Sequence, residues 1–69
     1  METIKGKFSL NKITKDDGNI VECTAFVSTR QVIEGKEGFF NLEKNVYGDL
    51  VVKQYVILDG DTAILGEHK

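Results

Sequence analysis

The chain has 69 residues, 41% of them apolar and 29% charged, and a formal net charge of −2. This length is enough for one small domain, residues 1–69, and the apolar content argues against disorder. No apolar stretch is long enough for a transmembrane helix, and the single cysteine excludes an internal disulfide or a site of several thiolates.

The first predicted strand covers residues 3–11. One of its faces carries Ile4, Gly6, Phe8 and Leu10. Lysines and small polar residues alternate with them, and this period of two indicates a half-buried strand. A bulge is expected at Asn11-Lys12, after which Ile13 resumes the pattern.

The second predicted strand covers residues 20–27, after a turn over residues 16–19 that Asp and Gly favour. One of its faces carries Val21, Cys23, Ala25 and Val27. Its other face is mixed, with Ile20 and Phe26 among polar residues. Ser28 and Gln31 then have the spacing of a capping box, but Gly35 ends any helical turn early.

Three further strands follow, over residues 39–42, 50–58 and 62–65, with turns at 34–38, 47–49 and 59–61. A single helical turn at 41–44 is an alternative, and residues 66–69 are expected to fray. The five segments predict an all-β fold, a small five-stranded antiparallel barrel or a strongly bent meander, SH3-like or OB-like. At most one or two single helical turns are expected.

The residue types that carry catalysis or hold metals are sparse and badly placed. His68 is next to the C-terminus, where a catalytic base is seldom held rigidly. Cys23 lies among apolar residues and is expected to be a buried hydrophobic residue rather than a reactive thiol. The acidic turn residues lack the EF-hand spacing; they are Asp16, Asp17, Asp59 and Asp61. We therefore expect no enzyme, no cofactor and no metal.

A basic surface is predicted near the start of the chain. Residues 1–15 have a net charge of +3 and residues 16–69 one of −5. The basic residues are Lys5, Lys7, Lys12 and Lys15. They could contact the phosphates of a nucleic acid, although Phe8 lies on the opposite face from Lys5 and Lys7. The simpler interpretation, which we favour, is that these lysines protect an edge or outer strand against edge pairing.

An apolar surface is the second candidate, because residues 50–58 are apolar on both faces. Either the strand coils so that both faces enter one core, or an exposed apolar patch remains, and such patches mark interaction sites. Arg and Tyr are enriched at binding hot spots. The candidate partner-binding residues are Phe26, Arg30, Tyr47, Val51, Tyr55 and Ile57.

These features favour a non-catalytic β module that binds a protein partner or itself, such as an inhibitor, adaptor or assembly subunit. The acidic charge of residues 16–69 favours partners with a basic surface. The alternative is a small nucleic-acid-binding β-barrel that uses the lysines of the first strand. No membrane association is expected, and one free thiol suits the cytoplasm, a reducing compartment.

Overall fold

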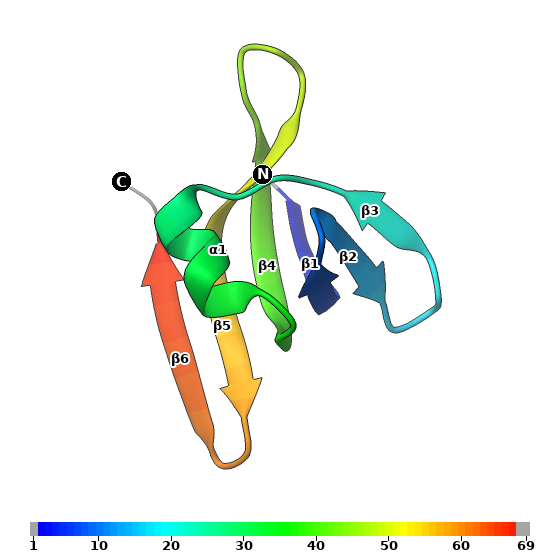
Figure 1. The fold of residues 1–69 in the computed structure, drawn as a ribbon. Coiled ribbons are helices and arrows are strands. Elements are labelled where there is room, and N and C mark those ends of the chain that lie inside the picture. Colours follow the sequence, from blue (N-terminus) through cyan, green and yellow to red (C-terminus); the bar gives the residue numbers. More distant parts are fainter. Residues whose placement is uncertain (1, 68–69) are drawn as a thin grey trace.

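A computed structural model describes residues 2–67 and folds them into one antiparallel sheet and one short helix (Figure 1). The strands are β1 (Glu2–Ser9), β2 (Lys12–Lys15), β3 (Ile20–Glu22), β4 (Glu37–Lys44), β5 (Leu50–Asp59) and β6 (Thr62–Glu67). The helix, α1, covers Val27–Ile33. The fold is all-β, as predicted, with six strands instead of five.

The strands lie in the order β3-β2-β1-β4-β5-β6, and β3 and β6 form the two edges. Among residues 2–67, continuous strand pairing therefore forms an open sheet and does not close the predicted barrel. One isolated parallel bridge, between Thr24 and Val51, joins the chain after β3 to β5. In Figure 1, α1 lies in front of β4 and β5 and covers one face of the sheet, here called the inner face.

The first predicted strand is in fact a hairpin of β1 and β2. Leu10 and Asn11 form its turn with φ of 51° and 60°, which is the geometry of a two-residue type I′ turn. Leu10, which we predicted on the apolar face, is 80% exposed. Alternation could not reveal this turn, because a branched residue such as leucine rarely has a positive φ. The side chain of Glu34 supports the turn by accepting a hydrogen bond from the Leu10 N–H at 3.0 Å.

The second predicted strand ends early, at Glu22, because Thr24 bonds to β5 instead of continuing beside β2. Cys23 and Ala25 are buried, as predicted, but Val27 begins α1 and is 72% exposed. The helix has Phe26 at its N-cap and no side-chain cap, so the predicted capping box does not form.

Helix α1 packs on the inner face through two residues one turn apart. Thr29 and Ile33 are buried, and Ile33 joins the core cluster. Gly35 follows with a φ of 74°, so the helix ends there as predicted. The seven residues of α1 suffice to cover part of one face, which we had not expected of so short a helix.

A bulge in β5 explains why this strand is apolar on both faces. Asn41 pairs with Gln54 but Leu42 pairs with Val52, so Lys53 is an extra residue. A bulge reverses the alternation of the side chains. Val52 therefore joins Tyr55 and Ile57 on the inner face, whereas strict alternation separates them.

Two glycines bring neighbouring strands close together on the inner face. Gly6 of β1 is the cross-strand partner of Gly38 of β4. A Cβ on Gly6 would overlap the Thr14 carbonyl, and one on Gly38 would overlap the Val56 carbonyl. Only glycine allows this approach of one backbone to another.

The core lies between α1 and the inner face. Its fully buried side chains are Phe8, Ile13, Ile33, Phe40, Leu42, Val52 and Ile57.

β4 occupies residues 41–44, where a helical turn was the alternative. β6 includes Gly66 and Glu67, which we expected to fray. The expectation for His68 and Lys69 lies outside the described residues. No helix within residues 2–67 is long and apolar enough to cross a membrane.

Candidate functional site

The outer face of the sheet, opposite α1, carries an apolar row that crosses three strands. Phe39 of β4 pairs with Val56 of β5, and Val56 pairs with Leu65 of β6. Phe39 is 41% exposed and Leu65 is 73% exposed. Lys5 of β1 continues the row, with its Nζ 5.8 Å from the centre of the Phe39 ring. These side chains are accessible because α1 packs on the other face.

A polar row lies beside the apolar row on the same face. Asn41 Nδ2 donates to Gln54 Oε1 at 3.1 Å, and Gln54 Nε2 donates to Glu67 Oε2 at 2.9 Å. Thr3, the cross-strand partner of Asn41, extends the row to β1. The buried Oδ1 of Asn41 has no hydrogen-bond partner among the described residues. The row therefore contains one acceptor atom that is buried and unpaired.

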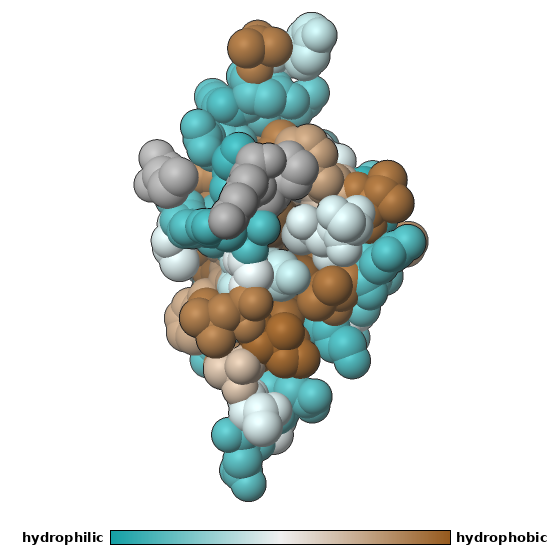
Figure 2. Space-filling model, turned by 90° about the vertical axis from the view of Figure 1, so that its left-hand side faces the viewer, coloured by the Kyte–Doolittle hydropathy of each residue, from teal (hydrophilic) through white to brown (hydrophobic). Residues whose placement is uncertain are grey.

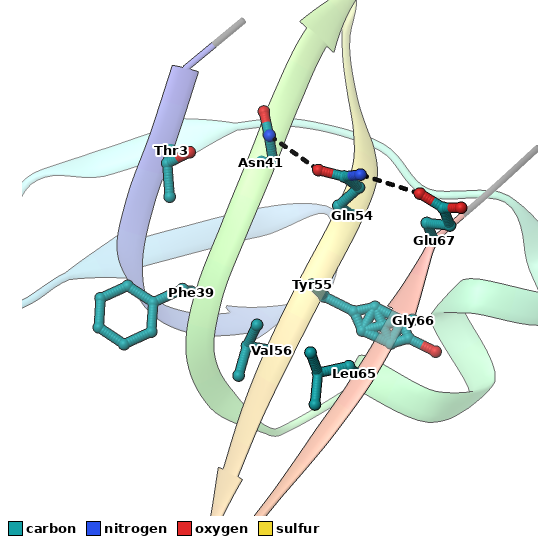
Figure 3. A pocket seen from close by; sticks show the side chains of 9 residues that line it. All are labelled: Thr3, Phe39, Asn41, Gln54, Tyr55, Val56, Leu65, Gly66 and Glu67. Carbon is teal, nitrogen blue, oxygen red and sulfur yellow. Dashed lines mark hydrogen bonds between the residues drawn. The ribbon is translucent and has the colours of Figure 1, made fainter.

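The two rows line a shallow hollow with a volume of about 460 Å³ (Figure 3). Phe39, Val56 and Leu65 form its apolar part, and the Asn41–Gln54–Glu67 chain forms one side. The Tyr55 ring passes behind β6 and occupies the space where Gly66 has no side chain. The hollow thus combines an apolar surface with hydrogen-bonding groups, as protein-binding surfaces do.

The structure does not gather the predicted partner-binding residues on one surface. Val51 is 7% exposed and Ile57 is 1% exposed, so neither is accessible to a partner. Tyr55 is half-buried and packs against the core. Phe26 precedes α1, and Tyr47 is 85% exposed in the turn between β4 and β5. These residues therefore do not form the exposed patch that we proposed as one alternative.

Arg30 holds the chain before α1 in place. Its Nη2 donates to Thr24 Oγ1 at 3.2 Å and to the Ala25 carbonyl at 3.4 Å. Its Nε is buried without a hydrogen-bond partner among the described residues. These contacts tie the helix to the segment that bridges to β5, so the structure gives Arg30 a role in the fold.

The four lysines lie on the β1–β2 hairpin, and acidic groups are close to several of them. Lys5 Nζ is 3.6 Å from Asp16 Oδ2, and Lys15 Nζ is 4.0 Å from Asp17 Oδ2. Lys7 is the cross-strand partner of Glu37, and Lys12 is that of Glu22. Neighbouring carboxylates reduce the positive potential that phosphates would meet.

Cys23 is buried in the core, and burial raises the pKa of its thiol from 9.0 to about 11. A thiol in this state is a poor nucleophile because it is rarely ionised.

Asp17 accepts a hydrogen bond from the Asn19 N–H at 2.9 Å, and this bond lowers the pKa of its carboxyl group.

The acidic turns do not come together as a metal site. Asp16 and Asp17 follow β2, whereas Asp59 and Asp61 belong to the β5–β6 hairpin. Within residues 2–67, no group of three or more His, Cys, Asp or Glu residues is placed to hold a metal ion.

A second hollow, of about 340 Å³, lies between Asn11, Glu22 and Asp49.

Sequence reasoning missed the outer-face residues Phe39, Val56 and Leu65. Strict alternation along residues 50–58 placed Val56 with Val52, which the bulge at Lys53 separates. The signal that was present is the Phe39-Phe40 pair, since one of two adjacent strand residues must face away from the core.

No protein-family model matches the chain, and neither does any curated protein or solved structure.

Proposed function

We propose that this protein is a non-catalytic module that binds a protein partner or a second copy of itself through the outer face of its sheet. The observation that carries this proposal is the uncovered apolar row of Phe39, Val56 and Leu65 beside a polar row. Exposed apolar patches bordered by polar groups are typical of interaction sites. Proteins of this kind act as inhibitors, adaptors or assembly subunits.

The charge of the molecule narrows the class of partner. Residues 16–69 have a net charge of −5, and Glu67 ends the polar row of the hollow. A surface with this charge favours association with partners that have a basic surface. We place the function in the cytoplasm, because a chain with one unpaired thiol suits a reducing compartment.

Serine substitutions at two exposed residues test the proposal. Phe39→Ser removes the largest side chain of the outer face, and Val46→Ser is the matched control in the β4–β5 turn, where Val46 is 91% exposed. Wild-type protein and both variants are immobilised and used to capture proteins from extracts, and their masses in solution are measured by light scattering.

We expect both variants to keep the circular dichroism spectrum of the wild type. Phe39→Ser should weaken partner capture or self-association at least about tenfold, since a central aromatic anchor contributes about 2 kcal/mol or more. Val46→Ser should leave both unchanged. If Phe39→Ser captures the same proteins as the wild type and has the same mass in solution, the outer face is not the binding surface.

A small nucleic-acid-binding barrel is the second candidate, and the bridge to β5 favours it. The Thr24 N–H donates to the Leu50 carbonyl at 2.8 Å, and the Val52 N–H donates to the Thr24 carbonyl at 2.9 Å. When this bridge is included, the chain after β3 lies beside β5, so that β1 to β5 are arranged around a ring. This strand order, with a helix between the third and fourth strands, resembles that of a partly open, OB-like barrel. Barrels of this class commonly bind oligonucleotides.

The lysines and Phe39 would form the contact surface for a nucleic acid, because Lys5 lies beside the Phe39 ring. Fluorescence anisotropy with single- and double-stranded oligonucleotides at two salt concentrations tests this candidate. Binding that weakens steeply with salt supports phosphate contacts, and a Lys5→Glu, Lys7→Glu variant should then lose it. No binding at low salt eliminates this candidate.

A further inference from the structure

We propose that β6 pairs antiparallel with β6 of a second copy, so that two sheets join into one across a two-fold axis. This inference goes beyond the proposed function, because the contact between the two copies is the open edge of the sheet at β6 and not the outer face itself. An antiparallel pair of identical strands makes a self-complementary interface, the commonest symmetry of homodimers.

The open edge of β6 lacks the features that usually protect an edge strand. An edge exposes unpaired N–H and C=O groups, and natural proteins shield them with lysines, prolines, bulges or very short strands. β6 has six residues and regular pairing with β5, and residues 62–66 contain no charge and no proline. Among residues 2–67, no strand pairs with its other side.

The opposite edge of the sheet shows the contrast. β3 has three residues, includes the charged Glu22, and gives way to the segment that crosses to β5. It therefore offers little edge for another chain. The two edges of one sheet differ in this way, and only β6 is suited to pairing with a further strand.

Apolar side chains stand on both sides of the β6 edge. Leu65 lies on the outer face, and Ile64, which pairs with the core residue Ile57, lies on the inner face. Leu65 is 73% exposed and Ile64 is 42% exposed. Figure 2 views the molecule from the side on which β6 lies in Figure 1, and brown surfaces gather in its lower half. A second copy of β6 would cover these side chains.

Charge selects the register of the pairing. Side chains alternate between faces, so a two-fold axis perpendicular to the sheet places one residue opposite its own copy. An axis at Ile64 would place Asp61 opposite Glu67 twice, and like charges directly opposite are destabilising. An axis at Leu65 places Ala63 opposite Glu67 instead. The apolar rows of the two copies then meet at Leu65 and become continuous.

Disulfide formation tests this register. Cα atoms of directly opposed antiparallel residues are about 4.5–5.5 Å apart, which is within the range of a disulfide. Leu65→Cys should form a covalent dimer under mild oxidation at least about tenfold faster than Ile64→Cys, whose copies would not be opposed. Wild-type protein should not cross-link, because Cys23 is buried.

A mass measurement tests the pairing without a new thiol. We expect light scattering of the wild type to approach twice the 7.7 kDa chain mass as the concentration rises. Leu65→Lys places a charge on the edge and should raise the dissociation constant at least about tenfold. Val46→Lys adds the same charge to another exposed residue and should leave the dimer intact. Circular dichroism verifies that both variants fold.

The outcomes separate this inference from the proposed function. A monomer at every concentration, with no cross-link at Leu65→Cys, overturns the pairing of β6. The proposed role of the outer face in binding is then tested separately, by the effect of Phe39→Ser on partner capture. A dimer that Leu65→Lys does not weaken, or that cross-links faster through Ile64→Cys, also overturns the pairing proposed here.

Discussion

The two faces of the sheet are made by the same strands, yet they have opposite characters. Phe40 points to the inner face and is fully buried, whereas its neighbour Phe39 points to the outer face and is 41% exposed. The Phe40 ring lies 6.2 Å from the Phe8 ring, centre to centre, within the core that α1 covers. The Phe39 ring has Lys5 beside it and no covering helix.

Under the proposed function, this difference would separate the residues that stabilise the fold from those that bind a partner. A domain of this size has little surface to bury and therefore uses one face of its sheet completely. The apolar residues of the other face are not needed for that core, so their exposure calls for a second explanation. Substitutions that compare the two faces should separate these roles.

The largest effect is expected from Phe40→Ala. It removes a fully buried ring and leaves a cavity beside Phe8, which should reduce the free energy of unfolding by about 3–5 kcal/mol. Urea unfolding followed by circular dichroism measures this change. A loss below about 1 kcal/mol would mean that the inner face is not the packed core.

Gly38→Ala should have the next largest effect. The added Cβ would overlap the Val56 carbonyl and force β4 and β5 apart. Overpacking of this kind costs about 1–3 kcal/mol, and more when backbone must move. The same unfolding measurement applies. The control is Gly18→Ala, a position with open space around the added Cβ but a φ of 89°, which isolates the cost of backbone strain.

Phe39→Ala should change stability little, in contrast to Phe40→Ala. Substitutions of exposed residues usually alter the free energy of unfolding by about 0.5 kcal/mol or less. Loss of binding without loss of stability would sharpen the contrast between the faces. A destabilisation as large as that of Phe40→Ala would contradict this contrast, because it would mean that Phe39 is buried in a packed core.

Cys23 reports on the integrity of the core. Because burial raises the pKa of its thiol from 9.0 to about 11, its thiolate population near pH 8 is reduced about a hundredfold. A thiol-reactive dye should therefore label the folded protein at least about a hundredfold more slowly than protein unfolded in guanidinium chloride. Equal labelling rates would show that the segment around Cys23 is open.

Asp17 should give the smallest effect, because it lies in an exposed turn away from both faces. The Asn19 N–H holds the pKa of the Asp17 carboxyl group below 3.8 in the folded state. Its contribution to stability is therefore present above pH 3.8 and lost as the pH falls through the lowered value. Asp17→Ala should slightly lower the Tm at pH 7 and should lower it less at pH 2. An equal loss of Tm at both pH values would contradict this cause.

Local pattern was enough to predict most of the elements. Alternation identified β1 and the buried positions of Ile4 and Phe8, and Gly35 marked the end of α1. The β1–β2 turn and the β5 bulge were missed, because each depends on backbone geometry that has no strong local signal. Because the bulge in β5 was missed, residues of this strand were assigned to the wrong face, and the predicted binding residues were not those of the outer face.

The sequence by itself determined that this protein is a small all-β domain with a buried thiol, because composition and alternation constrain local structure and burial. Only the tertiary structure decided which apolar residues remain exposed. Phe39, Val56 and Leu65 come from three strands, and their row exists only because long-range pairing sets the register. The physical reason is that periodicity assigns a residue to a face, whereas α1 determines which face is covered.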